Sequence, residues 1–373
     1  MQRSPAVVTA SAASPWSNTL RGLSRLRSVA CPQPGHAALR VLQLTNMYPS
    51  DSQPNRGMFV QSQVESLAAL GVACEVEEIQ GYLSTANYLR ALPLLPGRVR
   101  AGAFDLVHVH FGYTALAAVG VRGVPMVVSF CGDDLLGRPD ADGRRSAKSL
   151  LLADLGRRVA RRADAIVVKS DEMAQALGPM PCRVDVIPNG LDLDLFTPMD
   201  RTAARAALGW PQDQAIALFP ADPDEPRKNF RLAQAACERV RASGRELRLE
   251  WIFRRPQRDI VLGMAAADLM FSCSMQEGSP NAVKEAMAMN LPVLATDVGD
   301  CALRLAGCTP GAVLPAEADA FAAAALKVLD AGPRRSNGRE SVAPLALQNV
   351  AAQLLAVYRH ALRVHAGRQP GRA

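Results

Sequence analysis

Two glutamates, Glu277 and Glu285, are the residues whose spacing points most directly to chemistry. Ser279 followed by Pro280 predicts a helix with Ser279 as its N-cap and Pro280 at its first position, so that Glu277 lies in the approach loop and Glu285 inside the helix. The first backbone N–H groups of a helix are unpaired and carry a partial positive charge, so they bind phosphates and other anions. Two carboxylates beside such a site suit a ligand that also has hydroxyl groups.

A sugar nucleotide has both kinds of group, because its diphosphate suits the helix N-terminus and its ring and ribose hydroxyls suit the acids. The alternative is that Glu277 is a loop charge and Glu285 a solvated helical position. The flanking segments 267–272 and 291–296 are apolar and favour the binding hypothesis, since they predict buried parallel strands. The order strand, loop, helix, strand puts the Glu277 loop at the carboxyl end of a strand, where open α/β sheets bind ligands.

Composition predicts a soluble globular protein with room for two domains. The chain has 373 residues, of which 49% are hydrophobic and 21% charged. No apolar stretch approaches the roughly 20 residues that cross a bilayer. The net charge of +7 suits acidic substrates or peripheral contact with an anionic membrane. A basic stripe interleaved with aromatic residues is missing, so we expect no nucleic-acid partner.

The cysteines and the first residues bear on location. Eight cysteines are scattered without metal-ligand spacing, which predicts buried thiols, no metal site and a reduced cytoplasmic setting, with peripheral placement on the inner face of the membrane left open. Residues 1–38 are basic and rich in Ser, Ala and Pro, and we expect a disordered leader. The alternatives are a transit peptide or a membrane-surface helix that uses Leu20, Leu23 and Leu26.

Alternating strand and helix patterns predict an α/β protein with two doubly wound parallel sheets. We place the domains at residues 39–195 and 196–345, followed by a C-terminal helix at 346–365. Strands are predicted in the first domain at 39–44, 73–79, 104–110, 126–130, 165–169 and 184–187. In the second domain they are predicted at 215–219, 247–253, 269–272, 292–296 and 311–314.

Three further residues lie in or after predicted strands. Gly57 lies at a strand-to-helix junction, where a glycine either lets the backbone approach a phosphate or satisfies a turn with positive φ. His108 and His110 alternate along one strand. Either His110 serves a site at the strand end or the pair has no catalytic duty.

These motifs resemble the GT-B glycosyltransferases, and the residues are similar to the retaining family 4, also called group 1. Glu277 and Glu285 match the family's Glu-x7-Glu signature, and the resemblance covers residues 40–362. Further matching segments are 46–49 with 55–60, 105–110, 187–192 and 296–300. The resemblance implies two Rossmann-like domains that face each other across a cleft, with the C-terminal helix packing back toward the N-terminal domain.

The resemblance also implies a metal-independent retaining transferase without a cofactor. It would move a sugar from a UDP- or GDP-sugar to a hydroxyl of a glycan or lipid-linked acceptor, as in cell-surface polysaccharide synthesis. Glu285 would hold the ribose, Glu277 the transferred sugar and Lys228 the diphosphate. The implied donor-binding residues are Gly57, Asn189, Arg227, Lys228, Glu277, Gly278, Ser279, Pro280, Asn281, Glu285 and Gly299, and the candidates for catalysis are Glu277, His110 and Asp133.

Two departures from the family pattern leave alternatives open. Cys131 stands where family members commonly have a histidine, so that role is dispensable, or His110 or Asp133 takes it, or activity is reduced. The arginine usual before the phosphate lysine is missing from residues 221–225, which leaves Arg227 as a stand-in. The competing functions are a sugar-nucleotide 2-epimerase and a non-catalytic sugar-nucleotide binder. Acceptor contacts are expected from the loops 82–98 and 133–148.

Overall fold

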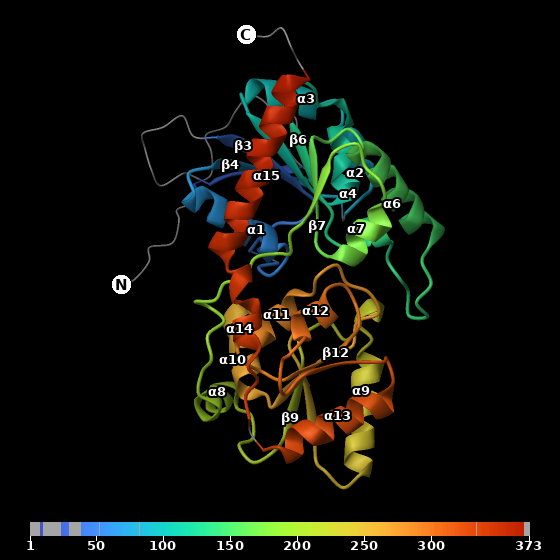
Figure 1. Ribbon diagram of the computed structural model, residues 1–373, viewed down its shortest axis with the longest axis vertical. Coiled ribbons are helices and arrows are strands. Elements are labelled where there is room, and N and C mark those ends of the chain that lie inside the picture. Colours follow the sequence, from blue (N-terminus) through green and yellow to red (C-terminus); the bar gives the residue numbers. More distant parts are fainter. Residues whose placement is uncertain are drawn as a thin grey trace.

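The computed structural model describes residues 8–9, 24–29, 39–51, 53–81, 83–332 and 334–368. Two α/β domains lie one above the other along the long axis of the molecule (Figure 1). The first holds an eight-stranded sheet of order β1-β2-β4-β3-β5-β6-β7-β8, and the second a five-stranded sheet of order β10-β9-β11-β12-β13. The predicted fold class is therefore confirmed.

The first sheet is parallel from β4 to β8 and is covered by helices on both faces. Its central strands β3, β5, β6 and β7 are short runs that are buried almost throughout, as parallel strands covered on both faces require, whereas the edge strand β8 is partly exposed. Their bounds are β3 (Arg40–Thr45), β4 (Ala73–Ile79), β5 (Leu106–His110), β6 (Met126–Ser129), β7 (Ala165–Val168) and β8 (Arg183–Val186). The helices are α1 (Met58–Ala69), α2 (Ala86–Ala91), α3 (Leu95–Ala101), α4 (Gly112–Ala115), α5 (Asp133–Leu136), α6 (Ala147–Ala160) and α7 (Asp171–Leu177).

The second sheet is parallel throughout. Its strands are β9 (Ile216–Phe219), β10 (Arg248–Trp251), β11 (Leu269–Ser272), β12 (Val293–Thr296) and β13 (Ala312–Leu314). The helices of this domain are α8 (Arg201–Leu208), α9 (Phe230–Ala242), α10 (Gln257–Ala266), α11 (Asn281–Ala288), α12 (Cys301–Leu305), α13 (Ala318–Asp330) and α14 (Gly338–Val342). Every strand predicted from the sequence is present, with small shifts at the ends.

The last helix, α15 (Leu347–Gly367), leaves the second domain and lies along the first (Figure 1). Its apolar side chains, among them Leu354 and Tyr358, belong to the core cluster on one face of the first sheet. The Tyr358 hydroxyl accepts a hydrogen bond from Gln43 Nε2 at 3.1 Å and lies 2.7 Å from Nδ1 of His108. The C-terminal helix thus packs back onto the first domain, as expected.

The segment before residue 39 corrects one prediction. Ser24–Val29 forms β2, which pairs antiparallel with β4 at the edge of the first sheet, and β2 pairs in turn with β1 (Val8–Thr9). Disorder is therefore wrong for these residues, and Leu26 lies in a strand instead of a surface helix. Leu20, Leu23 and the rest of the predicted leader lie outside the described residues.

Two further expectations concern the whole chain. No helix in the described ranges is long and apolar enough to cross a bilayer. Seven cysteines fall in these ranges, and each has a free thiol.

Candidate active site

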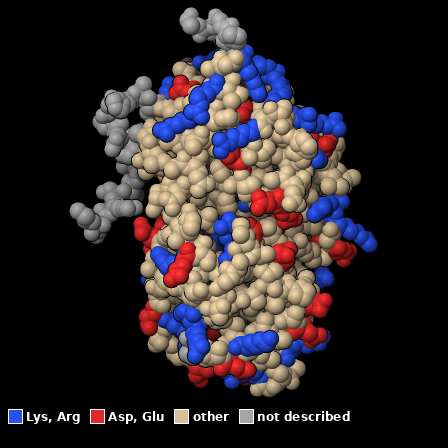
Figure 2. All heavy atoms as spheres, in the orientation of Figure 1, with Lys and Arg blue, Asp and Glu red and all other residues tan. Residues whose placement is uncertain are grey.

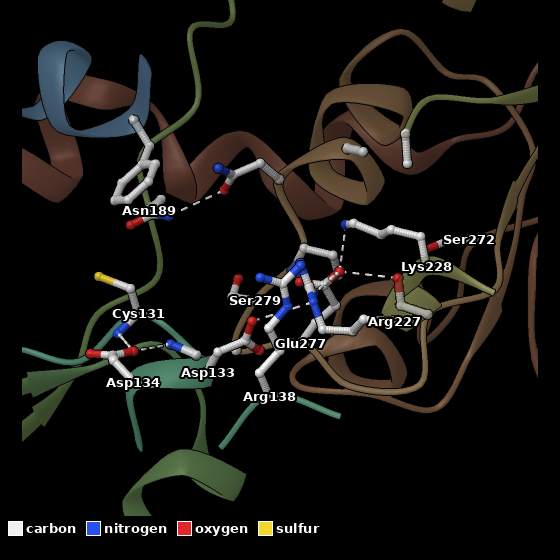
Figure 3. A pocket seen from close by; sticks show the side chains of 18 of the residues that line it. Cys131, Asp133, Asp134, Arg138, Asn189, Arg227, Lys228, Ser272, Glu277 and Ser279 are labelled. Carbon is white, nitrogen blue, oxygen red and sulfur yellow. Dashed lines mark hydrogen bonds and ion pairs between the residues drawn. The ribbon is translucent and has the colours of Figure 1, made fainter. Parts of the chain in front are cut away.

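A cavity of about 430 Å³ lies between the two domains, at the carboxyl ends of both sheets (Figure 3). Its lining follows directly after β3, β5 and β6 on one side and after β9 and β11 on the other. This is where open α/β sheets bind ligands. The predicted site residues that line it are Asp133, Asn189, Arg227, Lys228, Glu277, Gly278, Ser279, Pro280 and Asn281, whereas Gly57, His110, Glu285 and Gly299 are outside its lining.

The helix α11 opens at this cavity, between the two glutamates as predicted. It begins at Asn281 with Pro280 as N-cap, so the prediction of Ser279 as the capping side chain is wrong by one residue. The reason is that the Ser279 hydroxyl donates to Asp300 Oδ2 at 3.0 Å, and Arg304 Nε donates to the same oxygen at 2.7 Å. With no side chain capping them, the first amides of α11 are left for a ligand.

Two glycines let the backbone approach closely beside α11. A Cβ atom on Gly278 would lie 2.8 Å from the carbonyl oxygen of Cys131, and one on Gly299 would lie 2.6 Å from that of Gly278. Gly299 also has a φ of 60°, and its N–H donates to Glu172 of α7 at 2.9 Å. Gly299 therefore supports the loop and bridges the domains instead of facing the cavity.

Glu277 forms ion pairs with two cations of the second domain that line the cavity, Lys228 and Arg227 (Figure 3). Lys228 Nζ lies 2.6 Å and Arg227 Nη1 2.8 Å from the same oxygen, Oε1, which also accepts from Ser274 Oγ at 3.0 Å. Burial opposes ionisation of this carboxyl, but Lys228 and Arg227 outweigh it and lower the pKa of Glu277 to about 2. Glu277 is thus ionised at neutral pH, and it neutralises the charges that a diphosphate would attract.

Glu285 lies within α11, outside the cavity lining. Burial raises the pKa of its carboxyl to about 7, against the attraction of Lys284 and Lys228. Lys284 is only 1% exposed and donates from Nζ to the carbonyl oxygen of Asn189 at 3.1 Å. Burial lowers the pKa of Lys284 to about 8. The second glutamate is therefore a group that titrates near neutrality.

The two adjacent aspartates of α5 differ in surroundings. Asp134 is buried and accepts hydrogen bonds from the amides of Gly112, Cys131 and Gly132 at 2.7–2.9 Å. Burial raises the pKa of Asp134 to about 6, and its oxygens accept hydrogen bonds from backbone amides. Asp133 lines the cavity, where Oδ1 accepts from Gln276 at 3.2 Å; burial raises its pKa as well.

His110 is not placed for catalysis, which corrects one of the candidates. It is 1% exposed, and its Nε2 lies 2.9 Å from Gln43 Oε1. Its ring centroid is 4.1 Å from that of His108, whose Nε2 lies 2.7 Å from Ser129 Oγ. Burial, helped by the charge of Lys169, lowers the pKa of His110 to about 3. Both histidines are neutral members of a buried network.

Cys131 and Gly57 have local explanations. Cys131 lines the cavity, and burial raises the pKa of its thiol to about 12, so the thiol is protonated at neutral pH. Gly57 has a φ of 74°, and a Cβ atom there would lie 2.6 Å from the carbonyl oxygen of Met47. Of the two interpretations of Gly57, the turn with positive φ agrees with this geometry.

Sequence patterns missed one residue that joins the domains. Gln276 precedes Glu277 and is 4% exposed, and its side chain forms hydrogen bonds with the first domain. Oε1 accepts from Arg145 at 2.7 and 3.1 Å, and Nε2 donates to Asp133 and to the carbonyl oxygen of Gly137. No local signal marks this residue, because its partners come from another domain.

Five further first-domain residues line the cavity, from loops and from the starts of α1 and α4: Asn46, Met47, Phe59, Phe111 and Tyr113. The first three lie in the segments 46–49 and 55–60 that match the family, but none of the five was named as a site residue. Phe111 has a φ of 71°, a conformation that costs a non-glycine residue on the order of 1–3 kcal/mol.

No metal site is apparent from the side chains. Within the described ranges, no group of three or more His, Cys, Asp or Glu converges closely enough to hold an ion. The cavity carboxylates are instead engaged by Lys228, Arg227, Gln276 and backbone amides.

Two Rossmann-like domains with a charged cavity between the carboxyl ends of their sheets define a GT-B protein. The profile of Glycosyltransferase Family 4 matches residues 44–195, and that of Glycosyl transferases group 1 matches residues 222–331. The chain therefore belongs to the family 4, group 1 glycosyltransferases.

Curated relatives match over part of their length. A D-inositol 3-phosphate glycosyltransferase of Catenulispora acidiphila is 34% identical over 146 residues, which are 35% of this chain and 34% of that protein. The enzyme of the same name from Mycobacterium bovis is 33% identical over 136 residues, 32% of this chain and 26% of that protein. The matches thus span about a third of these relatives or less.

Solved structures share the fold over most of the chain. Sucrose-phosphate synthase from Thermosynechococcus elongatus superposes with a TM-score of 0.71 at 19% identity, covering 88% of this chain and 100% of that one. HepE of Anabaena, in complex with UDP and glucose, gives a TM-score of 0.63 at 19% identity, covering 86% and 99%. At these identities the likeness concerns the fold alone.

Proposed function

We propose that this protein is a metal-independent retaining glycosyltransferase. It transfers a hexose-type sugar from a UDP- or GDP-sugar to a hydroxyl of a glycan or lipid-linked acceptor. The observation that carries the proposal is the uncapped N-terminus of α11 beside Lys228 and Arg227 in the interdomain cavity. Together these groups supply the positive potential that a departing diphosphate needs.

The cations that pair with Glu277 can exchange this carboxylate for the diphosphate of a bound donor. A bound diphosphate competes for Lys228 and Arg227, which both contact Glu277 Oε1. When Lys228 moves to the phosphate, the carboxylate is free to accept hydroxyls of the transferred sugar. In the ligand-free protein Glu277 is ionised, because Lys228 and Arg227 lower its pKa to about 2.

The configuration at the anomeric carbon is retained without a protein nucleophile. The acceptor oxygen bonds to the anomeric carbon on the face that the diphosphate leaves, the carbon–oxygen bond to the diphosphate breaks, and a diphosphate oxygen takes the acceptor's proton. Two nearby groups are poor nucleophiles. Cys131 is protonated, and the oxygens of Asp134 accept three backbone N–H groups.

Names of relatives agree with this class of reaction. The curated relatives are named D-inositol 3-phosphate glycosyltransferases, and the HepE structure contains UDP and glucose. For this chain, the ribose of the donor is assigned to Glu285 and the diphosphate to residues 278–281. We assign the transferred sugar to Glu277.

Location and partners complete the proposal. We place the protein in the cytoplasm. Peripheral contact with the inner face of the membrane is proposed because Leu150 and Leu151 of α6 are exposed beside Lys148. Nucleic acid is not a proposed partner, since acidic and basic side chains are interspersed on the face in Figure 2.

Incubation with a panel of UDP- and GDP-sugars tests the proposal. Released nucleotide is measured with and without EDTA, and we expect turnover of at least one donor that EDTA does not change. Strict metal dependence, or no turnover or hydrolysis of any donor, would contradict the proposal.

A non-catalytic sugar-nucleotide binder is the second candidate, and the protonated Cys131 in the cavity favours it. Tight donor binding without transfer, converted to transfer by Cys131→His, would support this candidate. A 2-epimerase is disfavoured, because such chemistry needs acid–base groups around the donor and His108 and His110 are buried outside the cavity. NMR of a donor incubated without acceptor would reveal an epimer.

A further inference from the structure

A second pocket lies at the amino end of the second sheet, opposite the active-site cavity. It has a volume of about 260 Å³, and its lining includes Ala215, which precedes β9, and Asp268, which precedes β11. Four arginines also line it: Arg201, Arg245, Arg334 and Arg335. We propose that this arginine pocket binds a small soluble ligand that carries a phosphate or diphosphate group.

The arginine pocket is separate from the active-site cavity. The strand β9 runs between them, because Ala215 precedes its amino end and Phe219, at its carboxyl end, lines the cavity. Four residues of strand span ~13 Å, which exceeds the length of a diphosphate group. A volume slightly below the roughly 300–1,000 Å³ of typical ligand pockets suits a small molecule.

Three separate segments bring the arginines together. Arg201 is the first residue of α8, and Arg245 lies between α9 and β10. Arg334 and Arg335 lie between α13 and α14. Arg245 and Arg334 are exposed, whereas Arg201 and Arg335 are partly buried. The two exposed side chains can turn toward a ligand without loss of core packing.

The carboxylate of Asp268 in the lining already pairs with two arginines. Its Oδ1 lies 2.9 Å from Arg201 Nη2. Its Oδ2 accepts from Arg205 Nη2 at 2.8 Å and from the backbone N–H of Ile216 at 2.7 Å. Arg205 is 0% exposed and lies outside the lining, where its Nε donates to the carbonyl oxygen of Ala266 at 2.9 Å. Asp268 thus neutralises one of these two arginines and leaves the charge of the other.

The other three arginines of the lining have no carboxylate within ion-pair distance among the described residues. Arg245 Nη2 donates to the carbonyl oxygen of Leu329 at 3.4 Å, and Arg335 Nη2 donates to that of Ala265. These carbonyls lie in the last turns of α13 and α10, where the helix dipole favours a cation. Helix capping therefore explains part of the role of these two arginines, and it leaves the Arg334 side chain without a partner in the described ranges.

Positive charge in the arginine pocket exceeds negative charge. Counting Arg205, five guanidinium groups stand against the carboxylates of Asp268 and the exposed Asp213. The C-terminal ends of α10 and α13 each add about half a negative charge, so a net charge of about +2 remains. Burial lowers the pKa of Arg335 and outweighs the attraction of a nearby carboxylate, and the charges of Arg201 and Arg205 lower it further. The arginines therefore repel one another, and a bound anion relieves this repulsion.

The charge and geometry of the pocket favour a phosphate group over other anions. A guanidinium group is planar and donates two parallel hydrogen bonds to phosphate oxygens. A phosphate ester carries about −1.5 to −2 charges at pH 7 and a diphosphate carries more, whereas a monocarboxylate carries a single charge. A phosphate therefore matches the excess positive charge and uses the donors of more than one arginine.

Isothermal titration calorimetry on the full chain tests the inference at pH 7.5 in 0.15 M NaCl. Lys228→Met weakens the proposed diphosphate site, so this variant is the background in which the arginine pocket is titrated with pyrophosphate. We expect pyrophosphate to bind with a Kd below about 1 mM, and acetate not to bind. Inorganic phosphate and glucose 6-phosphate then show whether a free anion or a phosphate ester binds more tightly. Either order supports the inference, because the phosphate group is common to both.

Variants locate the binding site. Arg245→Gln and Arg334→Gln together remove two exposed charges and should weaken pyrophosphate binding at least about tenfold in the Lys228→Met background. The control is Arg241→Gln, because Arg241 is an exposed arginine of α9 outside the pocket lining, and it should change the Kd less than about twofold. Thermal unfolding without ligand checks that each variant is folded. Pyrophosphate should raise the Tm of the Lys228→Met protein, and this rise should be lost with the two arginines.

Three results would overturn the inference. Pyrophosphate does not bind to the Lys228→Met protein, or the loss of Arg245 and Arg334 leaves its Kd within about twofold, or Arg241→Gln weakens binding as much as they do. The last result indicates nonspecific attraction to a basic surface. The proposed function fails by a different result, in which the wild-type chain consumes no sugar-nucleotide donor. Pyrophosphate binding is measured without a donor, so the two outcomes are read separately.

Discussion

The two sides of the cavity solve different recognition problems. The second domain contributes a helix N-terminus, two cations and a carboxylate that joins them. The first domain contributes aromatic rings, two amide oxygens without partners and a backbone turn held by the buried Asp134. One side is therefore suited to an anion and the other to a neutral ring.

This difference suggests how the site directs charge during transfer. Negative charge develops only on the diphosphate, so positive potential is useful on the second-domain side alone. A cation on the acceptor side would compete for the diphosphate and attract anions that cannot react. Among the described first-domain residues, the one cation that lines the cavity, Arg138, is paired with Glu225. The unequal distribution of cations agrees with a diphosphate site on the second domain.

Loss of the lysine that faces the diphosphate is expected to have the largest effect. Lys228→Met should lower kcat/KM about 1,000-fold, roughly 4 kcal/mol, because it removes a charge from the leaving group. Steady-state kinetics of donor consumption measures this. Lys327→Met, in an exposed position of α13, is the control and should have no effect. A change below threefold in the Lys228 variant would break the contrast between the two sides.

Glu285 is expected to have a smaller, pH-dependent effect. Its pKa of about 7 means that it gains charge between pH 6 and 8, and the charged form accepts hydroxyls more strongly. The KM for the donor should fall as pH rises through this range, and Glu285→Gln should raise it about tenfold and remove the dependence. A pH profile of the variant that parallels the wild type would contradict this role.

The same carboxyl affects stability in the opposite direction. Its folded-state pKa is raised above the unfolded value of about 4.5, so its contribution is fully present below pH 4.5 and is lost as pH rises through 7. Glu285→Gln should therefore gain stability over the wild type on going from pH 4.5 to pH 8, on the order of 3 kcal/mol. Thermal unfolding of the ligand-free protein at several pH values measures the difference.

Gln276 tests whether the two sides must be held together. Gln276→Ala removes the contacts to Arg145, Asp133 and Gly137, and we expect about a tenfold lower kcat/KM with more donor hydrolysis relative to transfer, because water enters a looser cavity. The control is Arg144→Ala, because Arg144 is an exposed residue next to Arg145 in the first domain. An unchanged ratio of hydrolysis to transfer would show that this contact is only structural.

Cys131 is expected to have the smallest effect. With a thiol pKa of about 12, it is protonated and neither reacts as a nucleophile nor transfers protons near neutral pH. Cys131→Ser should change kcat by less than threefold, and the thiol should resist iodoacetamide at pH 8. Loss of activity in the serine variant would assign Cys131 a direct role.

Sequence patterns predicted the parts of the molecule that depend on local order. The parallel strands were predictable because each is a short apolar run next to a helix-forming segment, and the opening of α11 followed from Ser279 and Pro280. Even there the capping residue was wrong, because Asp300, from a later loop, binds the Ser279 hydroxyl. Capping rules that use only neighbouring residues cannot predict a hydrogen-bond partner from a distant part of the sequence.

The remaining features depend on distant partners. The strand β2 exists through its pairing with β4, which no local pattern in Ser24–Val29 signals. The burial of His110 depends on Gln43 and on α15, since Tyr358 joins the same network. The first-domain lining of the cavity brings together Asn46 and Phe111 from two loops and Phe59 from the first turn of α1. Groups of residues that are far apart in the sequence have no regular spacing from which a single sequence could predict their contact.

A crystal structure of the complex with UDP or GDP tests the central claim most directly. The account predicts that the diphosphate contacts the amides of residues 279–281 at the start of α11, and that Lys228 Nζ has moved from Glu277 to a phosphate oxygen. A diphosphate bound elsewhere, or bound in the cavity with the Lys228–Glu277 pair intact, would contradict it.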